Sequence, residues 1–211
     1  MLFTNTVQPG TLQLLDTLMQ VPELSEFLLV GGTNLSLRFG HRISVDLDLF
    51  TNEPFDRNEV YGGVVKSLPQ TILLDQRKQT IWLTIDGVKI DLILHEYPYL
   101  KGVEKINGIR FLSVDDIVPM KLEAMATRGV KKDFWDIAEL LNHFSLSQML
   151  DFYQRKYPNS DPGHILLAMT YFNDAEVEKI DPQMLNGVTW QQVKDRMRTT
   201  VSEYVQHKLG Q

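Results

Sequence analysis

A Gly-Gly pair between two segments of different periodicity is the feature that most constrains this sequence. The run FLLVG is short and apolar, as in a buried strand, whereas TNLSLRFG has helical periodicity and ends at Gly40. Gly31 and Gly32 let the backbone approach a ligand closely, and N–H groups at a helix start suit a phosphate. The hydroxyl of Thr33 is a further candidate donor. We therefore expect a phosphate-binding turn between a strand and a helix.

Two aspartates follow this turn at strand spacing. The segment VDLDLF alternates apolar and acidic residues, which places Asp46 and Asp48 on one face of a predicted strand. The other face, expected in the core, carries Val45, Leu47 and Leu49. Neighbouring carboxylates repel each other unless a cation lies between them, and Mg²⁺ takes oxygen ligands while leaving room for substrate phosphates. The alternative is a solvated edge strand with two exposed aspartates.

A third aspartate lies in a later apolar segment, VKIDLIL. Alternation places one set of its residues on a single face: Val88, Ile90, Leu92 and Leu94. Asp91 falls on the opposite face, between Lys89 and Ile93, and is the candidate third metal ligand. Taken alone, it is equally a surface aspartate on a half-exposed strand. Asp86, which precedes this segment, is better explained by a turn.

Strand-like segments give way to helical ones near residue 113, which predicts an α+β chain in two parts. Residues 1–112 are expected to form a mixed β-sheet flanked by helices, and residues 113–211 a helical region. The first part begins with a helix at 11–20, has another at 56–68, and continues with strands at 71–75, 80–85, 88–94 and 109–112. Asp86-Gly87 predicts a hairpin turn. The helical segments of the second part are VPMKLEAMATR, KKDFWDIAELL, SLSQMLDFYQRKY, GHILLAMTYF and TWQQVKDRMRTTVSEYVQHKL. Pro119 leaves the start of the first of these open, because proline belongs in an opening turn.

Together these motifs resemble those of the polymerase-β-type nucleotidyltransferase superfamily. The resemblance is carried by Val30-Gly31-Gly32, by Asp46-Leu47-Asp48-Leu49 and by Asp91 within an apolar strand. More specifically, the chain is similar to the AbiEii/AbiGii toxin family in Arg42-x-Ser44-x-Asp46-x-Asp48, Met120-Lys121-Leu122, Arg128-Gly129 and Lys132-Asp133-x-x-Asp136-Ile137. The resemblance implies a nucleotidyltransferase fold, Mg²⁺ at the three aspartates and an NTP as co-substrate.

Four charged residues of the helical part belong to this resemblance. Lys121 and Arg128 share a helix face and suit phosphate oxygens, one as a point charge and the other as a planar fork. Asp133 and Asp136 share a face of the next helix and are candidates to orient either cation. From the residues alone, Lys121 and Arg128 are equally consistent with a solvated basic face, and an ordinary polar helix face is the better explanation for Asp133 and Asp136. The resemblance favours function for Asp133 and leaves Asp136 open.

Two residues ahead of the acidic strand are second-rank candidates. Ser44 falls within the motif and is a candidate for lining the nucleotide pocket. Arg42 suits either a phosphate or a neighbouring carboxylate.

Composition excludes several other classes of protein. With no cysteine in 211 residues, the chain has no disulfides, cysteine zinc sites or thiol catalysis. The five histidines show no HExxH-like spacing, and no Walker-type loop or GxSxG elbow is present. No secretory signal and no apolar run long enough to span a bilayer is visible, so we expect a cytoplasmic protein without membrane contact. Trp82, Trp135 and Trp190 are expected to be packing residues rather than base-stacking platforms.

The resemblance implies transfer of NMP from an NTP to an acceptor hydroxyl, with a tRNA 3′ end as the expected acceptor. It also implies the toxin of a toxin–antitoxin system with a cognate antitoxin protein. The net charge of −6 mildly favours a different acceptor, a protein side chain or a small molecule. The remaining alternative is a catalytically silent nucleotide-binding module.

Overall fold

The computed structural model describes residues 1–210 of the chain. Its contacts divide it into two compact units, Met1–Ser113 and Val114 to the C-terminus. Strands within residues 1–210 occur only in the first unit, which holds a seven-stranded mixed sheet, whereas the second unit is helical. The predicted α+β class is confirmed by this architecture.

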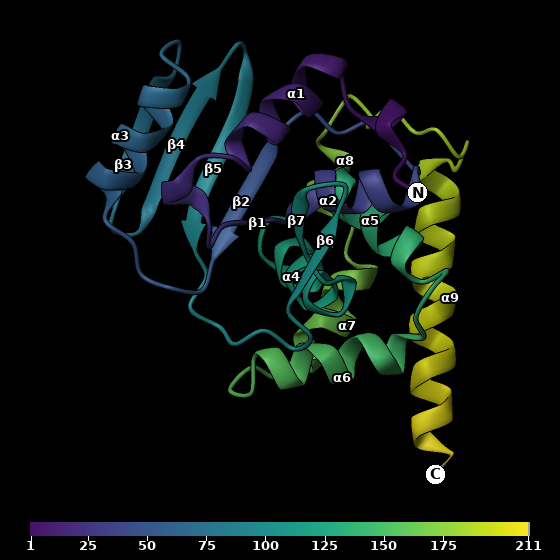
Figure 1. The fold of residues 1–211 in the computed structure, drawn as a ribbon. Helices are drawn as coiled ribbons and strands as arrows, with labels where there is room; N and C mark the ends of the chain where they lie inside the picture. The colour runs from purple at the N-terminus through teal and green to yellow at the C-terminus, as the bar shows by residue number, and fades with distance from the viewer. Residues whose placement is uncertain (211) are drawn as a thin grey trace. The chain divides into compact units, whose positions relative to one another are not determined.

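The first unit combines the sheet with short helices (Figure 1). Its helical elements are η1 (Thr4–Thr6), α1 (Pro9–Leu18), η2 (Pro22–Leu24), α2 (Gly31–Phe39) and α3 (Arg57–Ser67). Its strands are β1 (Leu28–Leu29), β2 (Leu47–Thr51), β3 (Ile72–Arg77), β4 (Thr80–Ile85), β5 (Val88–Leu94), β6 (Val103–Ile106) and β7 (Ile109–Leu112). The strand order is β3-β4-β5-β2-β1-β7-β6. The pairs β2–β5 and β1–β7 are parallel, and the other pairs are antiparallel.

Two hairpins of the sheet close through two-residue turns with left-handed backbone. Asp86 (φ 50°) and Gly87 (φ 81°) join β4 to β5, as the sequence predicts. Asn107 (φ 51°) and Gly108 (φ 83°) join β6 to β7 in the same way. Positive φ at both central residues is typical of a type I′ turn, which matches the twist of the flanking strands. The second hairpin and strand β6 were not predicted.

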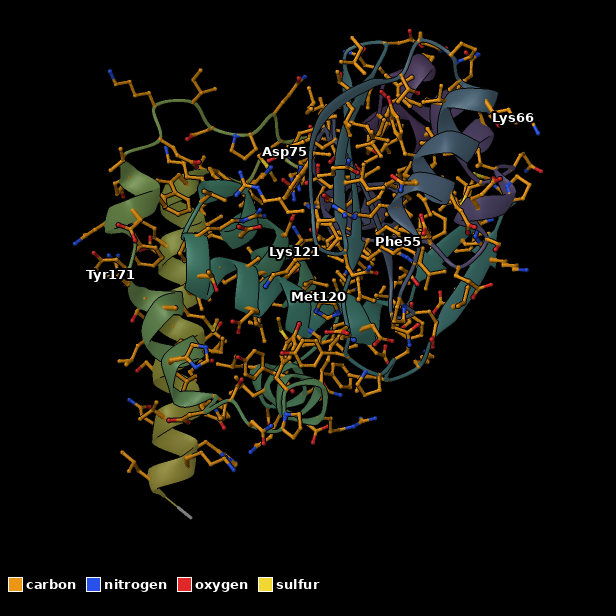
Figure 2. The ribbon with its side chains drawn as sticks, turned by 90° about the vertical axis from the view of Figure 1, so that its left-hand side faces the viewer. Phe55, Lys66, Asp75, Met120, Lys121 and Tyr171 are labelled. Carbon is orange, nitrogen blue, oxygen red and sulfur yellow. The ribbon has the colours of Figure 1, made fainter. Side chains whose placement is uncertain are left out.

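The core of the first unit lies on one face of the sheet, against α1, η2 and α3. Alternate residues of β2, β4 and β5 point into it, including Leu47, Ile81 and Leu92, none of which is exposed. Figure 1 shows α3 alongside β3 and β4. In Figure 2, Phe55 turns toward this packed interior, where its ring meets Phe27 edge-on, while Lys66 extends outward from α3.

Within residues 114–210, the second unit is built from six helices. They are α4 (Val114–Arg128), α5 (Lys131–Leu140), α6 (Leu146–Lys156), α7 (Gly163–Thr170), α8 (Asn173–Glu176) and α9 (Trp190–Leu209). Pro119 lies inside α4, five residues past its start, so the helix begins earlier than the proline suggested. Capping boxes at Ser145 and Thr189 begin α6 and α9. Among residues 1–210, no helix has the length and apolar character needed to cross a bilayer.

Candidate active site

Gly31 brings the backbone against the carboxylate of Asp48. It is the first residue of α2 and has a φ of 68°, in the left-handed region that favours glycine. A Cβ at this position would lie 2.0 Å from Oδ2 of Asp48, closer than any real contact. The N–H of Val30 also donates to the carbonyl of Asp48 (2.9 Å). The glycine is therefore required for Asp48 to occupy its place beside the start of α2.

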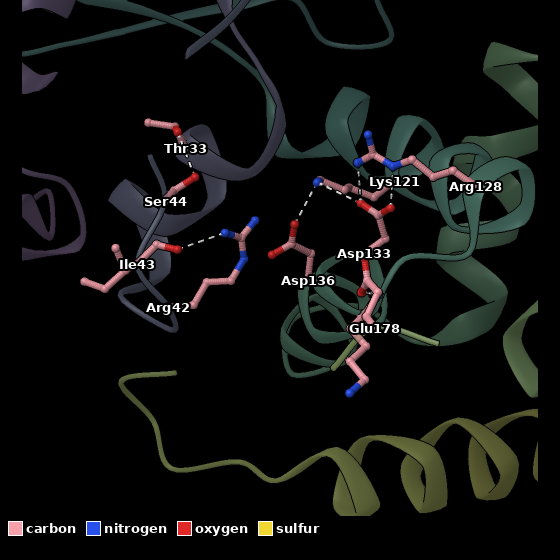
Figure 3. Close-up of polar contacts among 10 residues, drawn as sticks. Thr33, Arg42, Ile43, Ser44, Lys121, Arg128, Asp133, Asp136 and Glu178 are labelled. Carbon is pink, nitrogen blue, oxygen red and sulfur yellow. Dashed lines mark hydrogen bonds and ion pairs between the residues drawn. The ribbon is translucent and has the colours of Figure 1, made fainter. Parts of the chain in front are cut away.

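The second glycine allows the loop before β2 to pack on α2. A Cβ at Gly32 would lie 2.1 Å from Nη2 of Arg42 and 3.4 Å from Oγ of Ser44. Figure 3 shows the hydroxyl of Thr33 next to that of Ser44 (2.9 Å) and Arg42 donating to the carbonyl of Ile43 (3.0 Å). Ser44 is buried, as are Arg42 and Thr33. These contacts fix the approach of the chain to β2.

Two expectations about this loop need correction. Thr33 was expected to offer its hydroxyl to a phosphate, but that hydroxyl is buried between Ser44 Oγ and the carbonyl of Asp46. Val45 was expected in the core, but it is 55% exposed because β2 begins only at Leu47. Asp46 thus precedes the strand, and strand alternation does not determine where its carboxylate points.

Asp48 and Asp91 are neighbours across the parallel strands β2 and β5. They are register partners, so both lie on the sheet face opposite the core, here called the carboxylate face. Adjacent strands are about 4.8 Å apart, which places two acidic side chains next to each other. The ammonium of Lys89, two residues before Asp91 on the same face, lies 3.0 Å from Asp91 Oδ1.

The oxygen atoms on this face have the chemistry of a hard-cation site. Lys89 donates a hydrogen bond to Oδ2 of Asp91 (3.0 Å), whereas Oδ1 is shielded from solvent and receives no hydrogen bond of acceptable geometry. Among residues 1–210, no three acidic or histidine side chains already stand close enough together to hold a metal. Asp48 and Asp91 could offer two adjacent oxygen ligands, and a metal there would complete its shell with other groups, such as Asp46 or phosphate oxygens.

A second polar cluster joins α4 and α5 within the helical unit (Figure 3). Arg128 forms a two-pronged ion pair with Asp133, with both N–O distances at 2.7 Å. Lys121 lies 2.7 Å from Asp136 and 3.4 Å from Asp133. Gly129, with a φ of 58°, ends α4 and turns the chain into α5.

Burial separates the members of this cluster. The side chains of Asp133 and Asp136 are 0% exposed and that of Lys121 is 5% exposed, which rules out a solvated polar face for these three. Arg128 is 50% exposed. The two cations and two anions of the cluster balance in formal charge. Because Arg128 is half-exposed and Asp133 holds its guanidinium in a fixed plane, Arg128 is the member best presented to a ligand.

Lys89 is a member of the site that sequence reasoning did not single out. Its spacing of two residues from Asp91 in a strand was sufficient to place both on one face. The segment VKIDLIL was interpreted through its apolar alternation, which singles out Asp91 as a candidate ligand and assigns no role to Lys89.

Comparison with known proteins gives the same class as the site. The family model described as "Nucleotidyl transferase AbiEii toxin, Type IV TA system" matches residues 13–209. An uncharacterized protein of Aquifex aeolicus (strain VF5) is 35% identical over 192 residues, covering 87% of this chain and 90% of that protein.

Solved structures share the fold at low sequence identity. MenT4, a nucleotidyltransferase toxin from Mycobacterium tuberculosis, aligns with a TM-score of 0.58 and 14% identity over 89% of this chain and 82% of that one. JHP933 from Helicobacter pylori aligns with a TM-score of 0.53 and 18% identity over 97% of this chain and 98% of that one.

The family model defines the chain as a nucleotidyltransferase, and the fold agrees with that class. Within that class, the chain belongs to the AbiEii nucleotidyltransferase toxin family of type IV toxin–antitoxin systems.

Proposed function

We propose that this protein transfers NMP from an NTP to an acceptor hydroxyl at the carboxylate face, with Mg²⁺ as its metal. The observation that supports this most directly is the register of Asp48 with Asp91, next to the glycine-bearing start of α2. Asp46, Asp48 and Asp91 would hold the metal, which when bound would neutralise phosphate charge and lower the pKa of the acceptor hydroxyl.

The protein's own groups divide the remaining tasks. The backbone at Gly31 and Gly32 receives the triphosphate, where N–H groups at a helix start favour anions. Asp91 either binds the metal that activates the acceptor or serves as the base that takes the acceptor's proton, as the acceptor oxygen forms its bond to the α-phosphorus. The bond between the α-phosphorus and its bridging oxygen to the β-phosphate breaks, and pyrophosphate leaves with that electron pair.

Within the helical unit, Arg128 is the candidate to neutralise charge on a phosphate ligand. Its guanidinium is half-exposed and held in a fixed plane by Asp133. Lys121 was expected to meet phosphate itself, but its burial between Asp133 and Asp136 supports a positioning role instead. Lys121 thereby holds Asp133 in place to orient Arg128.

Label transfer from radiolabelled NTPs to total tRNA in the presence of Mg²⁺ tests the proposal. Asp48→Asn and Asp91→Asn should each reduce transfer by at least a hundredfold, while their thermal unfolding stays cooperative. Asp86→Asn is the matched control, because Asp86 lies in the exposed β4–β5 turn and contacts Gln70. Undiminished transfer by both site variants would sink the assignment.

The acceptor is proposed to be a tRNA 3′ end, as the sequence resemblance implies. The physiological restraint is proposed to be a cognate antitoxin, in keeping with a type IV toxin–antitoxin family. Separating the labelled products into RNA, protein and small-molecule fractions tests the acceptor. The alternative acceptor, a protein side chain or a small molecule, is mildly favoured by the net charge of −6. Label found only in the protein or small-molecule fraction would show that the acceptor is not tRNA. Co-expression with the neighbouring gene, scored by recovery of growth, tests the antitoxin.

A further inference from the structure

Four side chains form a line across the carboxylate face, perpendicular to the strands. Asp48 of β2 is the register partner of Asp91 of β5, and Asp91 is the partner of Trp82 of β4. Trp82 is in turn the partner of Asp75 of β3, the edge strand, which Figure 2 labels. Paired residues share a face, so an indole directly adjoins the proposed catalytic carboxylates.

Trp82 differs from the other two tryptophans in its polar and aromatic contacts. Trp135 donates its indole N–H to the Val188 carbonyl (3.2 Å), and Trp190 donates to Glu176 (3.0 Å). Those two rings also contact each other, with centroids 5.1 Å apart. Within residues 1–210, the half-buried indole of Trp82 makes neither a hydrogen bond nor a ring contact. Its indole N–H is not buried, so the polar edge of Trp82 reaches solvent on the carboxylate face.

The strand order decides which substrate Trp82 adjoins. Gly31 follows β1 and lies against Asp48, on one side of the carboxylate pair. Trp82 lies on the other side, beyond Asp91, because β4 flanks β5. If the proposed function holds, on which this inference rests, the triphosphate lies at the glycines and the acceptor hydroxyl at Asp91. Trp82 is then the neighbour of the acceptor.

We propose that Trp82 is a specificity-determining residue that stacks on the terminal nucleobase of an RNA acceptor. Every nucleobase has a flat π-face, and stacking on an aromatic side chain is a common means of holding single-stranded ends. RNA is favoured over a peptide because the β3–β4 turn of the same hairpin carries two exposed cations suited to phosphodiesters. Arg77, 76% exposed and 3.0 Å from Asp75, is followed by Lys78.

A pair of RNA ligands isolates the stacking interaction. A fluorescein-labelled RNA hairpin with a single-stranded 3′ end is prepared with either an intact or an abasic terminal nucleotide. Fluorescence anisotropy with the full-length wild type, without NTP, should show about tenfold tighter binding of the intact RNA. Trp82→Ala should bind both RNAs equally, and Trp82→Phe should keep most of the difference.

Ile72→Ala is the matched control for this experiment. Ile72 is 60% exposed on the same sheet face, paired with Thr84, but has no ring. The variant should keep the tenfold preference for the terminal base, and circular dichroism should show that all three variants retain the wild-type fold.

The outcomes separate this inference from the proposed function. If RNA is labelled but Trp82→Ala keeps the wild-type preference for the intact end, the stacking role fails while the proposed function stands. If the wild type labels only protein or small molecules and binds neither RNA, both the RNA acceptor and the role of Trp82 are overturned.

Discussion

The carboxylate of Asp91 pairs with Lys89 on its own strand, β5, and lies beside Asp48 on the neighbouring strand, β2. Lys89 Nζ lies 3.0 Å from Asp91 Oδ1, and the side chains are 50% and 16% exposed. The register of β2 with β5 puts the second carboxylate within one strand spacing. A divalent cation at this face would therefore meet an aspartate that already has a cationic neighbour.

Removing that neighbour should strengthen metal binding. Lys89→Gln deletes a positive charge whose repulsion of a nearby cation is about 1 kcal/mol per unit charge at 4 Å in a water-like dielectric. The Mg²⁺ concentration for half-maximal transfer should accordingly fall severalfold. Lys66→Gln, which removes an exposed charge from α3 (Figure 2), should leave the midpoint unchanged. An unchanged or higher midpoint in Lys89→Gln would contradict this competition.

Gly31→Ala should abolish transfer without unfolding the protein. The added Cβ forces Asp48 away from the start of α2, and the positive φ costs a non-glycine residue about 1–2 kcal/mol. We expect at least a hundredfold loss of transfer with a modest fall in melting temperature. Gly62→Ala is the control, since a Cβ there meets nothing within 4 Å and alanine should stabilise α3 by about 0.5–1 kcal/mol. Full activity in Gly31→Ala would show that Asp48 needs no such contact.

Strands with alternating burial were the most predictable part of the fold. The predicted spans of β4, β5 and β7 match the structure residue for residue, because alternation and the Asp86-Gly87 turn define them. β6 was missed because VEKI is exposed or half-buried along its length and has no apolar face to reveal it. Its Asn107-Gly108 turn was the signal that could have found it.

The sequence predicted only those parts of the candidate site whose geometry is set within a single helix or strand. The side-by-side placement of Asp48 and Asp91 depends on a parallel pairing between distant segments, which no local pattern gives. Likewise, helical spacing put Lys121 and Arg128 on one face but did not reveal that Lys121 is buried by its ion pairs. Alternation was extended two residues too far, to Val45, where the chain is not yet a strand.

Substitution of Lys121 should mainly lower stability, whereas substitution of Arg128 should mainly lower activity. Lys121→Met leaves the buried Asp136 without its 2.7 Å partner and should destabilise the protein by about 3–5 kcal/mol in urea titrations. Arg128→Lys keeps the charge at a half-exposed position, so it should cost under about 1 kcal/mol, yet it loses the planar fork. Transfer at saturating acceptor should therefore drop at least tenfold for Arg128→Lys, with KM for NTP raised. The reverse pattern, a stable Lys121→Met and a fully active Arg128→Lys, would overturn the division of roles.

Glu176 should make the helical unit sensitive to acid. Hydrogen bonds from Lys194 and Trp190 hold the pKa of Glu176 below its ordinary value of 4.5. Because the folded-state pKa is the lower one, this stabilisation is present above the unfolded value and is lost as pH falls through the folded value. The melting-temperature advantage of wild type over Glu176→Gln should thus shrink below about pH 4.5. The melting temperature of Lys194→Met, which lacks the hydrogen bond from Lys194, should likewise depend less on pH below about 4.5 than that of wild type. A wild-type advantage over Glu176→Gln that stays constant across pH would contradict this prediction.

Lys156 and Asp116 form an ion pair between α6 and α4 that is fully buried. Both side chains are 0% exposed, and Nζ lies 2.9 Å from Oδ1. Lys156→Met should destabilise the protein by about 3–5 kcal/mol, because it leaves a charged carboxylate in a dry environment. Adding Asp116→Val should restore most of that loss, since an apolar pair of suitable size needs no desolvation of charge. Arg155→Ala is the matched control one residue earlier: its pair with Asp151 is exposed at 3.5 Å and should contribute under about 0.5 kcal/mol. Urea unfolding of wild type, Lys156→Met, the double variant and Arg155→Ala measures these differences. A double variant no more stable than Lys156→Met would contradict the explanation that the loss comes from the carboxylate left behind.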